Sequence, residues 1–397
     1  MAVTETILEI PVTLELPVGP QHPALHEPVL LRIYADGEVV SRVEVNTGYN
    51  HRGVEKLLES VPYQRGIFVA SRICGICNAV HSDCFIRALE ELMGIEPPPR
   101  AKYLRVLAME LERIHSHMLI AAVAAELIGF DTLFMYIMRD RELVMKAKEI
   151  LTGGRVHADY MMIGGVRRDI DDVKKERILK LLDRIEASLR SYLRVYQEDA
   201  VILRRLADVG RIKPSSALRA SLVGPVLRGS GVKSDSRAEE LYEAYSELDF
   251  EIVAREEGDA LARMLVRLEE ALVSVELCRQ VLSKLPQGSA VVDERRLPPS
   301  IPQGEAYARV EAPRGELTYY VVGSGAAKPY RVKVRTPSLN NVVNGSFVYV
   351  GHTLADVPAI LASFDPCISC MDRAIVKKRG ETRVVKLREL AERGAGL

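Results

Sequence analysis

The spacing of apolar residues divides the chain into three regions. Over residues 6–46, short apolar runs alternate with polar positions, and Asp36-Gly37 separates two of these runs as a hairpin turn would. From about residue 55 to residue 285, apolar residues recur at steps of three and four, which predicts long packed helices. Proline and glycine then punctuate the chain before strand-like runs return in residues 306–338. The pattern predicts a helical core with one small sheet before it and another after it.

The expected fold class is therefore α+β and mainly α, with a long central helix bundle flanked by small N-terminal and C-terminal β-sheets. A short helix is expected at residues 356–364, close to the end of the chain. There is no internal repeat and no low-complexity linker, so residues 1–397 are expected to form a single domain. The expected parts are an N-terminal β region, a helical core, a C-terminal β region and a C-terminal extension: residues 1–54, 55–290, 300–373 and 374–397.

Charge and composition narrow the functional classes. The chain has 54 basic and 54 acidic residues, so nothing favours a nucleic acid as a partner, because binding to phosphates needs an excess of positive charge. No run of about eighteen apolar residues and no basic segment followed by an apolar one is found. We therefore expect neither a membrane span nor a signal peptide, and a cytoplasmic address is the default. The six cysteines are then expected to be reduced thiols that serve a metal or catalysis rather than disulfides.

Four of the cysteines form two CxxC pairs, Cys74/Cys77 and Cys367/Cys370. A CxxC lets two thiolates reach one metal from a single turn, and two pairs supply the four sulfurs of a tetrahedral or cluster site. Zinc is the commonest occupant of such a set, and iron–sulfur and redox sites are the alternatives. The pairs are about 290 residues apart, whereas zinc ribbons usually close within a few tens of residues. The spacing predicts a metal site and leaves the metal open.

The residues around the pairs narrow the choice. RICGIC followed by His81, together with DPCISC, resembles the two ligand motifs of nickel-iron hydrogenase large subunits. The resemblance implies that all four cysteines bind nickel and that one of each pair also bridges to an iron that carries cyanide and carbon monoxide. By position, Cys77 and Cys370 would be the bridging ligands, and Cys74 and Cys367 the terminal ones. Magnesium is a further candidate cofactor.

The resemblance extends over nearly the whole chain. It includes two relatives, the membrane-bound energy-converting hydrogenases and the homologous subunit of respiratory complex I, which share four further segments. These are residues 19–28 (GPQHPALHEP), 49–57 (YNHRGVEKL), 161–170 (MMIGGVRRDI) and 311–341. The complex I subunit has lost the cysteines and uses the vacated cavity for quinone, whereas all four are present here. Met371-Asp372-Arg373 stands where soluble and uptake hydrogenases end their second motif in a histidine, which favours the energy-converting branch.

Several residues around the cysteines acquire expected roles from the resemblance. Arg314 matches an arginine that overhangs the metals and contacts a cyanide, and Ser338 matches a hydroxyl that contacts a cyanide. Asp365 matches an acidic residue near the centre, where it is expected to hold Arg314 or Arg72. Without the motifs, Arg314 and Ser338 would be read as an ion-paired arginine and a turn serine.

Three more residues are expected near the centre. Glu27 matches a glutamate that gates protons in the family, His81 is expected to hydrogen-bond a cysteine sulfur, and Glu112 is matched to an outer aspartate. Glu27 could instead be a solvated surface residue and His81 a core residue. Cys84 and Cys278 have no partner at ligand spacing and are expected to be buried as small apolar side chains.

The resemblance also implies partners and a location. Iron–sulfur clusters are expected only in partner subunits, in particular a small subunit that supplies electrons, and ion-translocating membrane subunits would complete a complex on the cytoplasmic face of the membrane. A maturation protease is a further expected partner, with cleavage after Arg373; otherwise the tail is kept as a strand and helix. Two other functions remain open: a complex I-like quinone- or sulfur-reducing subunit without a working centre, and a structural zinc scaffold.

Overall fold

The computed structural model describes residues 13–23, 25–293, 295 and 297–371, together with the backbone of residues 375–378 and 381–384. Within these residues no helix is both long and apolar enough to span a membrane. The expected cleavage point after Arg373 lies outside the described residues.

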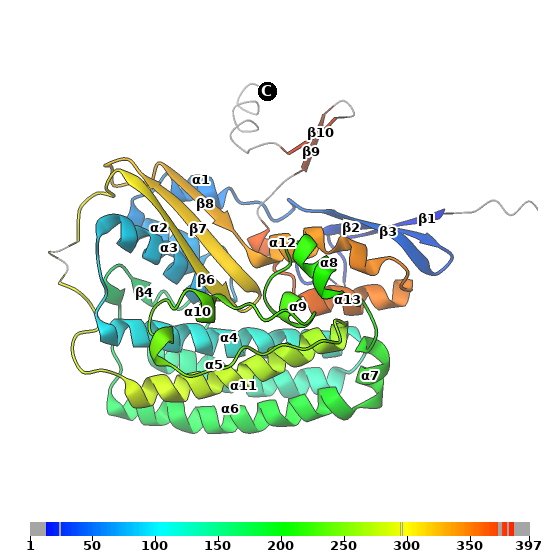
Figure 1. The fold of residues 1–397 in the computed structure, drawn as a ribbon, viewed down its shortest axis with the longest axis horizontal. Coiled ribbons are helices and arrows are strands. Elements are labelled where there is room, and N and C mark those ends of the chain that lie inside the picture. Colours follow the sequence, from blue (N-terminus) through cyan, green and yellow to red (C-terminus); the bar gives the residue numbers. More distant parts are fainter. Residues whose placement is uncertain are drawn as a thin grey trace, which may run out of the picture.

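Four long helices lie together along one side of the molecule (Figure 1). They are α4 (Pro99–Leu127), α5 (Asp131–Thr152), α6 (Asp172–Glu198) and α11 (Ala260–Lys284). Asp171 and Asp259 cap the starts of α6 and α11, where their side chains accept backbone N–H groups. α4 packs against both α5 and α11 and is buried on almost every face. The expected helical core is confirmed.

Shorter helices surround this bundle. Two of them, α1 (Val54–Leu58) and α2 (Tyr63–Ser71), precede the first cysteine pair, and α3 (Asn78–Met93) follows it. The others are α7 (Ala200–Leu206), α8 (Pro214–Arg219), α9 (Pro225–Arg228), α10 (Ser236–Glu239), α12 (Pro337–Asn344) and α13 (Val357–Phe364). Single 3₁₀ turns are η1 (Tyr245–Glu247), η3 (Ser346–Tyr349), η4 (Leu354–Asp356) and η5 (Ile368–Cys370). The short helix expected at residues 356–364 is confirmed as α13.

The prediction of long helices from residue 55 to residue 285 is wrong for residues 207–259. This stretch contains only α8, α9, α10 and η1 among turns and extended chain. Proline and glycine interrupt it, and at Gly224 the backbone passes so close to Gly315 that a Cβ atom would lie 2.4 Å from the Cα of Gly315. The main chain of this stretch packs closely against the C-terminal sheet, and it is therefore not free to form a long helix.

Two antiparallel three-stranded sheets flank the bundle, as expected. The N-terminal sheet contains β1 (Thr13–Val18), β2 (Leu30–Asp36) and β3 (Val39–Asn46) in that order. The expected turn at Asp36-Gly37 joins β2 to β3, with Gly37 at φ 60°. The C-terminal sheet contains β6 (Gly304–Ala312), β7 (Gly315–Gly323) and β8 (Arg331–Arg335), and α3 packs on β6 and β7.

Two small hairpins complete the strands. They are β4 (Met161–Met162) with β5 (Gly165–Val166), and β9 (Ile375–Lys378) with β10 (Glu381–Val384). β9 and β10 lie beyond the second cysteine pair, and Figure 1 shows them standing away from the helical bundle.

Buried ion pairs fix the C-terminal sheet on the bundle. Arg228 of α9 donates to Glu270 of α11 over 2.6 Å and to Glu311 of β6 over 2.7 Å, and all three side chains are buried. Burial lowers the pKa of His117 in α4 to about 4, so the neutral ring donates from Nε2 to Glu270 over 3.1 Å. Burial alone would raise the pKa of Glu270, but the Arg228 guanidinium beside it holds that pKa well below its usual range. One carboxylate thus connects three elements.

Glu270→Ala should therefore destabilise the protein strongly. The change leaves Arg228 short of a buried counter-charge and removes the acceptor of His117, which costs about 3–5 kcal/mol in comparable cases. Glu176→Ala is the control, because Glu176 pairs with Lys180 on the surface of α6, where the two side chains are 67% and 72% exposed, and such pairs contribute less than about 1 kcal/mol. Thermal and denaturant unfolding of both variants would measure the difference. Equal stabilities would contradict the role given to Glu270.

Candidate metal centre

The two cysteine pairs lie on loops from opposite ends of the chain that meet at one place. Cys74 is in the turn between α2 and α3, and Cys77 is the residue that caps the start of α3. Cys370 ends η5, which follows α13, and Cys367 precedes it. The Sγ atom of Cys367 lies 3.4 Å from that of Cys74 and 3.0 Å from that of Cys370. The sulfurs of Cys74, Cys77 and Cys370 all lie within 4.8 Å of one another.

The four thiols are buried, with exposures of 1–6%. Cys74 is the sulfur that holds negative charge most readily: hydrogen bonds from Cys367, Cys370 and Cys77 lower its pKa well below the usual range, and Arg314 adds to this. Its sulfur also accepts the backbone N–H groups of Ile76 and Cys77. Hydrogen bonds to Cys367 and Cys74 raise the pKa of Cys370, because four thiolates cannot share one buried site without a cation. The donor set therefore fits a bound metal that supplies positive charge.

Among the described residues, this cysteine cluster is the place where potential metal ligands gather in a group of three or more. Soft thiolates suit nickel, iron or zinc. They do not suit magnesium, which takes oxygen ligands. The magnesium candidate therefore gains no support from the described residues.

Arg314 and Asp365 form the buried ion pair beside the cysteines. Arg314 donates from Nη2 to the Asp365 carboxylate over 2.8 Å and from Nε to the Asp365 main-chain oxygen over 2.8 Å. Nη1 of Arg314 is buried and has no hydrogen-bond partner in the described structure. Ser338 accepts the N–H of Cys367 over 3.0 Å. An unpaired cationic N–H next to the thiols is suited to a small anionic ligand.

Of the two arginines expected for Asp365, Arg314 is the partner. Arg72 instead pairs with Asp159, with Nη2 and Oδ2 2.7 Å apart, and its side chain is 46% exposed. The reason is local, because Ser71 at the end of α2 also donates to Asp159 and holds this carboxylate beside Arg72. Arg72 thus lies next to Cys74 in the sequence without sharing the buried pair.

Glu27 reaches the second cysteine loop from the segment between β1 and β2. Its carboxylate accepts the N–H of Ile368 over 2.5 Å, the N–H of Ser369 over 3.2 Å, and the Ser369 hydroxyl. The side chain is half-buried rather than solvated. The acid therefore lies directly against the main chain between Cys367 and Cys370.

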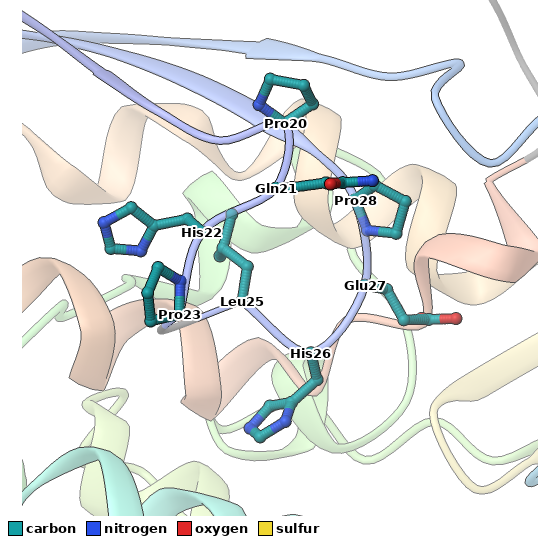
Figure 2. Close-up of a pocket in the computed structure, with 8 residues that line it drawn as sticks. All are labelled: Pro20, Gln21, His22, Pro23, Leu25, His26, Glu27 and Pro28. Carbon is teal, nitrogen blue, oxygen red and sulfur yellow. The ribbon is translucent and has the colours of Figure 1, made fainter.

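The same segment lines a surface hollow of about 410 Å³ (Figure 2). His22 and Glu27 project from opposite sides of the loop, and Nε2 of His26 lies 3.8 Å from the carboxylate of Glu126. Neither His22 nor His26 belongs to the cysteine cluster. Glu27 thus lies between this hollow and the loop that carries Cys367 and Cys370.

His81 contacts a cysteine sulfur, as expected. Its Nε2 lies 3.7 Å from the Sγ of Cys370, and its Nδ1 lies 2.8 Å from the hydroxyl of Tyr319. Burial lowers the pKa of His81 to about 4, so the ring is neutral. The sulfur is that of the second pair rather than of Cys77, which lies one turn before His81 in the same helix.

Glu112 supports the first cysteine loop from α4. Its two carboxylate oxygens accept the N–H groups of Ala79 and Val80, in the first turn of α3 directly after Cys77. Burial raises its pKa to about 7, against the effect of Lys148, whose Nζ lies 3.8 Å away. Glu112 therefore supports Cys77 through the first turn of the helix that follows it.

Cys84 and Cys278 are both fully buried and unpaired, as expected. Cys84 donates to the main-chain oxygen of Ala308 over 3.3 Å. Neither belongs to the cysteine cluster.

Sequence reasoning missed Arg52, which joins the two cysteine loops. Its guanidinium donates to the main-chain oxygens of Arg72 over 2.8 Å, Ile73 over 2.7 Å and Ser369 over 3.1 Å. Asn50 adds a hydrogen bond to the Ser369 hydroxyl over 3.0 Å. Both residues lie in the segment 49–57 that was singled out by its motif, which could have directed attention to them.

Two protein-family models match this chain. Residues 52–121 match the family model described as nickel-dependent hydrogenase. Residues 128–300 and 298–373 match the model described as respiratory-chain NADH dehydrogenase, 49 Kd subunit. The chain belongs to the family of nickel-dependent hydrogenase large subunits and complex I 49-kDa subunits.

Relatives within this family differ in activity. The carbon monoxide-induced hydrogenase of Rhodospirillum rubrum is 40% identical over 91% of this chain and 99% of its own length. The membrane-bound hydrogenase subunit alpha of Pyrococcus furiosus is 38% identical over 95% of this chain and 91% of its own length. An NADH-quinone oxidoreductase subunit of Sinorhizobium medicae is 37% identical over 90% of this chain and 95% of its own length.

A solved structure gives the same family by fold. It is that of the membrane-bound sulfane sulfur reductase, an archaeal respiratory membrane complex, with a TM-score of 0.86 and 37% identity over 91% of this chain and 98% of that one. The chain is therefore a subunit of a membrane-bound hydrogenase-like or complex I-like oxidoreductase complex.

Arg52→Ala should expose the cysteines of the cluster. The variant loses three hydrogen bonds from a charged donor, each contributing about 1.5–3 kcal/mol, so opening of the loops should become at least about tenfold more frequent. Alkylation of the metal-free protein, followed residue by residue by mass spectrometry, would measure this at Cys74 and Cys367. Cys84 and Cys278 are internal controls whose rates should not change. If all cysteines reacted alike in the variant, Arg52 would support the whole fold rather than the two loops.

Proposed function

We propose that this chain is the catalytic subunit of a membrane-associated nickel-iron hydrogenase, which reversibly reduces protons to H₂ while partner subunits translocate ions. The observation that carries the proposal is the convergence of four buried cysteine thiols from loops about 290 residues apart. The match to the nickel-dependent hydrogenase model and the two hydrogenase relatives support it.

The cysteines would hold the metals. Cys74, Cys77, Cys367 and Cys370 would together hold the nickel-iron group. When bound, the nickel-iron group supplies a redox-active metal pair with an open position for hydrogen and with cyanide and carbon monoxide on iron. The buried thiols support this assignment, because several of them can be thiolates together only if a cation lies among them.

Arg314 would act on the reacting atoms as a fixed cation. The pair with Asp365 holds its guanidinium in one orientation, so Nη1 is left for a ligand or for hydrogen at the metals. Ser338, bonded to the N–H of Cys367, would offer its own hydroxyl proton to a cyanide. A charge already held in place costs no reorganisation during the reaction.

Glu27 would carry protons between the cysteine loop and the surface. Its carboxylate lies against Ile368 and Ser369, and the residue also borders the hollow. A proton on Oε1 or Oε2 could therefore pass either to the cysteine loop or to the surface. Two protons that arrive by this route and two electrons from a partner would yield one H₂.

Electrons would come from an iron–sulfur small subunit, because the cysteines outside the cluster are two isolated buried thiols. Ion-translocating membrane subunits would hold the chain at the cytoplasmic face of the membrane. A maturation protease would act after Arg373 if the tail is removed; the intact mass of the purified chain would reveal this.

A second candidate function is reduction of sulfur or quinone without a working nickel-iron centre. The structural match to the sulfane sulfur reductase and the match to complex I subunits favour it. The two candidates differ in the cofactor, so direct metal analysis separates them.

Metal analysis of the purified complex should find nickel and iron together, and infrared spectra should contain bands of iron-bound carbon monoxide and cyanide. Cys370→Ser should abolish both signals because a hydroxyl is a poor ligand for these soft metals. Cys84→Ser, which changes a buried thiol outside the cluster, should retain them. Zinc without nickel, or a complex without these bands, would reject the hydrogenase proposal.

Glu27→Gln should lower hydrogen turnover by about 100-fold or more, since an amide cannot exchange the proton, while nickel and iron contents stay normal. The acceptor oxygen that remains in glutamine should preserve much of the contact with Ile368. The rate at which the enzyme exchanges D₂ with protons of the solvent would measure the effect. Glu15→Gln, on the exposed strand β1, is the control. Unchanged turnover in Glu27→Gln would exclude this residue from the proton route.

A further inference from the structure

His81 is placed between a metal-ligand sulfur and a phenol. Nε2 of His81 in α3 lies 3.7 Å from the Sγ of Cys370, and Nδ1 lies 2.8 Å from the hydroxyl of Tyr319 in β7. The two rings meet edge to face, with centroids 5.9 Å apart and planes at 81°. Exposures of 1% for His81 and 0% for Tyr319 leave no access for bulk water. One ring thus connects the second cysteine loop to the C-terminal sheet.

The protons on this chain of contacts can be assigned by counting donors. If Cys370 binds a metal as a thiolate, its sulfur can only accept a hydrogen bond. The proton between Cys370 and His81 must then be on Nε2. A neutral imidazole carries one N–H, so Nδ1 is bare and can only accept. The Tyr319 hydroxyl is therefore the donor to Nδ1.

The surroundings of the ring agree with this assignment. The ring of His81 is buried, and its two nitrogens face the Cys370 sulfur and the Tyr319 hydroxyl. In the described structure, His81 is the hydrogen-bond partner found for the Tyr319 hydroxyl. Phe85, one turn after His81 in α3, packs on the Tyr319 ring with centroids 5.7 Å apart and fixes its position.

We infer that Tyr319 is a positioning residue that keeps His81 in the Nε2–H tautomer and thereby maintains a hydrogen bond on the Cys370 sulfur. The inference rests on the proposed function, because it requires a metal-bound thiolate. A hydrogen bond to a ligand sulfur withdraws electron density from it and so tunes the attached metal. Tyr319 would act on the iron through two intervening residues without touching it.

Tyr319→Phe tests the inference in the assembled complex. The change removes one oxygen and retains the ring, so His81 can move its proton to Nδ1 and the bond to sulfur is lost. Cys370 should then donate more electron density to iron, and the carbon monoxide and cyanide bands should shift to lower wavenumber while nickel and iron contents stay normal. Tyr196→Phe is the matched control, because its hydroxyl donates to the Ala121 main-chain oxygen over 2.6 Å in an equally buried position. That variant should leave the bands in place.

A double-variant cycle separates this role from a general structural one. In a His81→Gln background the side-chain amide can donate to sulfur without help from Tyr319, so adding Tyr319→Phe should cause no further shift of the bands. Bands at unchanged positions in Tyr319→Phe, or an equal shift in the His81→Gln background, would overturn the inference alone. Absence of the bands from the unmodified complex would overturn the proposed function, and the inference with it.

Discussion

Two loops from opposite ends of the chain must be held together before four thiols can share one site, and the main chain of these loops is what the surrounding residues bind. Arg52 donates hydrogen bonds to main-chain carbonyl groups of both loops, and Glu27 accepts hydrogen bonds from N–H groups of the second loop. Ser338 and Glu112 bind further N–H groups at Cys367 and at the start of α3. Side chains that bind the main chain thus hold the two loops in place, and the cysteine sulfurs lie close together between them.

This arrangement depends on the rigidity of what lies beneath it. The buried pairs of Arg228 with Glu270 and Glu311 join the C-terminal sheet to the helical bundle. Arg314 lies in the turn between β6 and β7, and Tyr319 lies in β7. His81 belongs to α3, which packs on this sheet, and Cys77 directly precedes that helix. A small shift of the sheet would therefore move the cation and the phenol together relative to the sulfurs. Buried charge in this protein specifies position as much as it contributes stability.

The sequence allowed much of the fold to be predicted, for identifiable reasons. Steps of three and four residues indicated α4, α5, α6 and α11, and Asp36-Gly37 indicated a hairpin, because these signals are local. Residues 207–259 were predicted wrongly, since their path is set by contact with a distant sheet. The cysteines could be assigned to one site from their flanking motifs. Spacing alone could not pair Asp365 with Arg314 rather than Arg72, nor reveal Arg52 and Tyr319, whose contacts cross 20 to more than 300 residues.

Asp365 ends α13 with φ 53° and ψ 59°, a left-handed conformation that most side chains avoid and that aspartate tolerates better than most. Glycine would relax the backbone there but would remove the carboxylate that orients Arg314, whereas a longer acid would keep the charge and strain the turn. Backbone geometry and electrostatics thus impose separate demands on a single position, two residues before Cys367. Very few side chains satisfy both, so this site should tolerate far less variation than its place at a helix end would suggest.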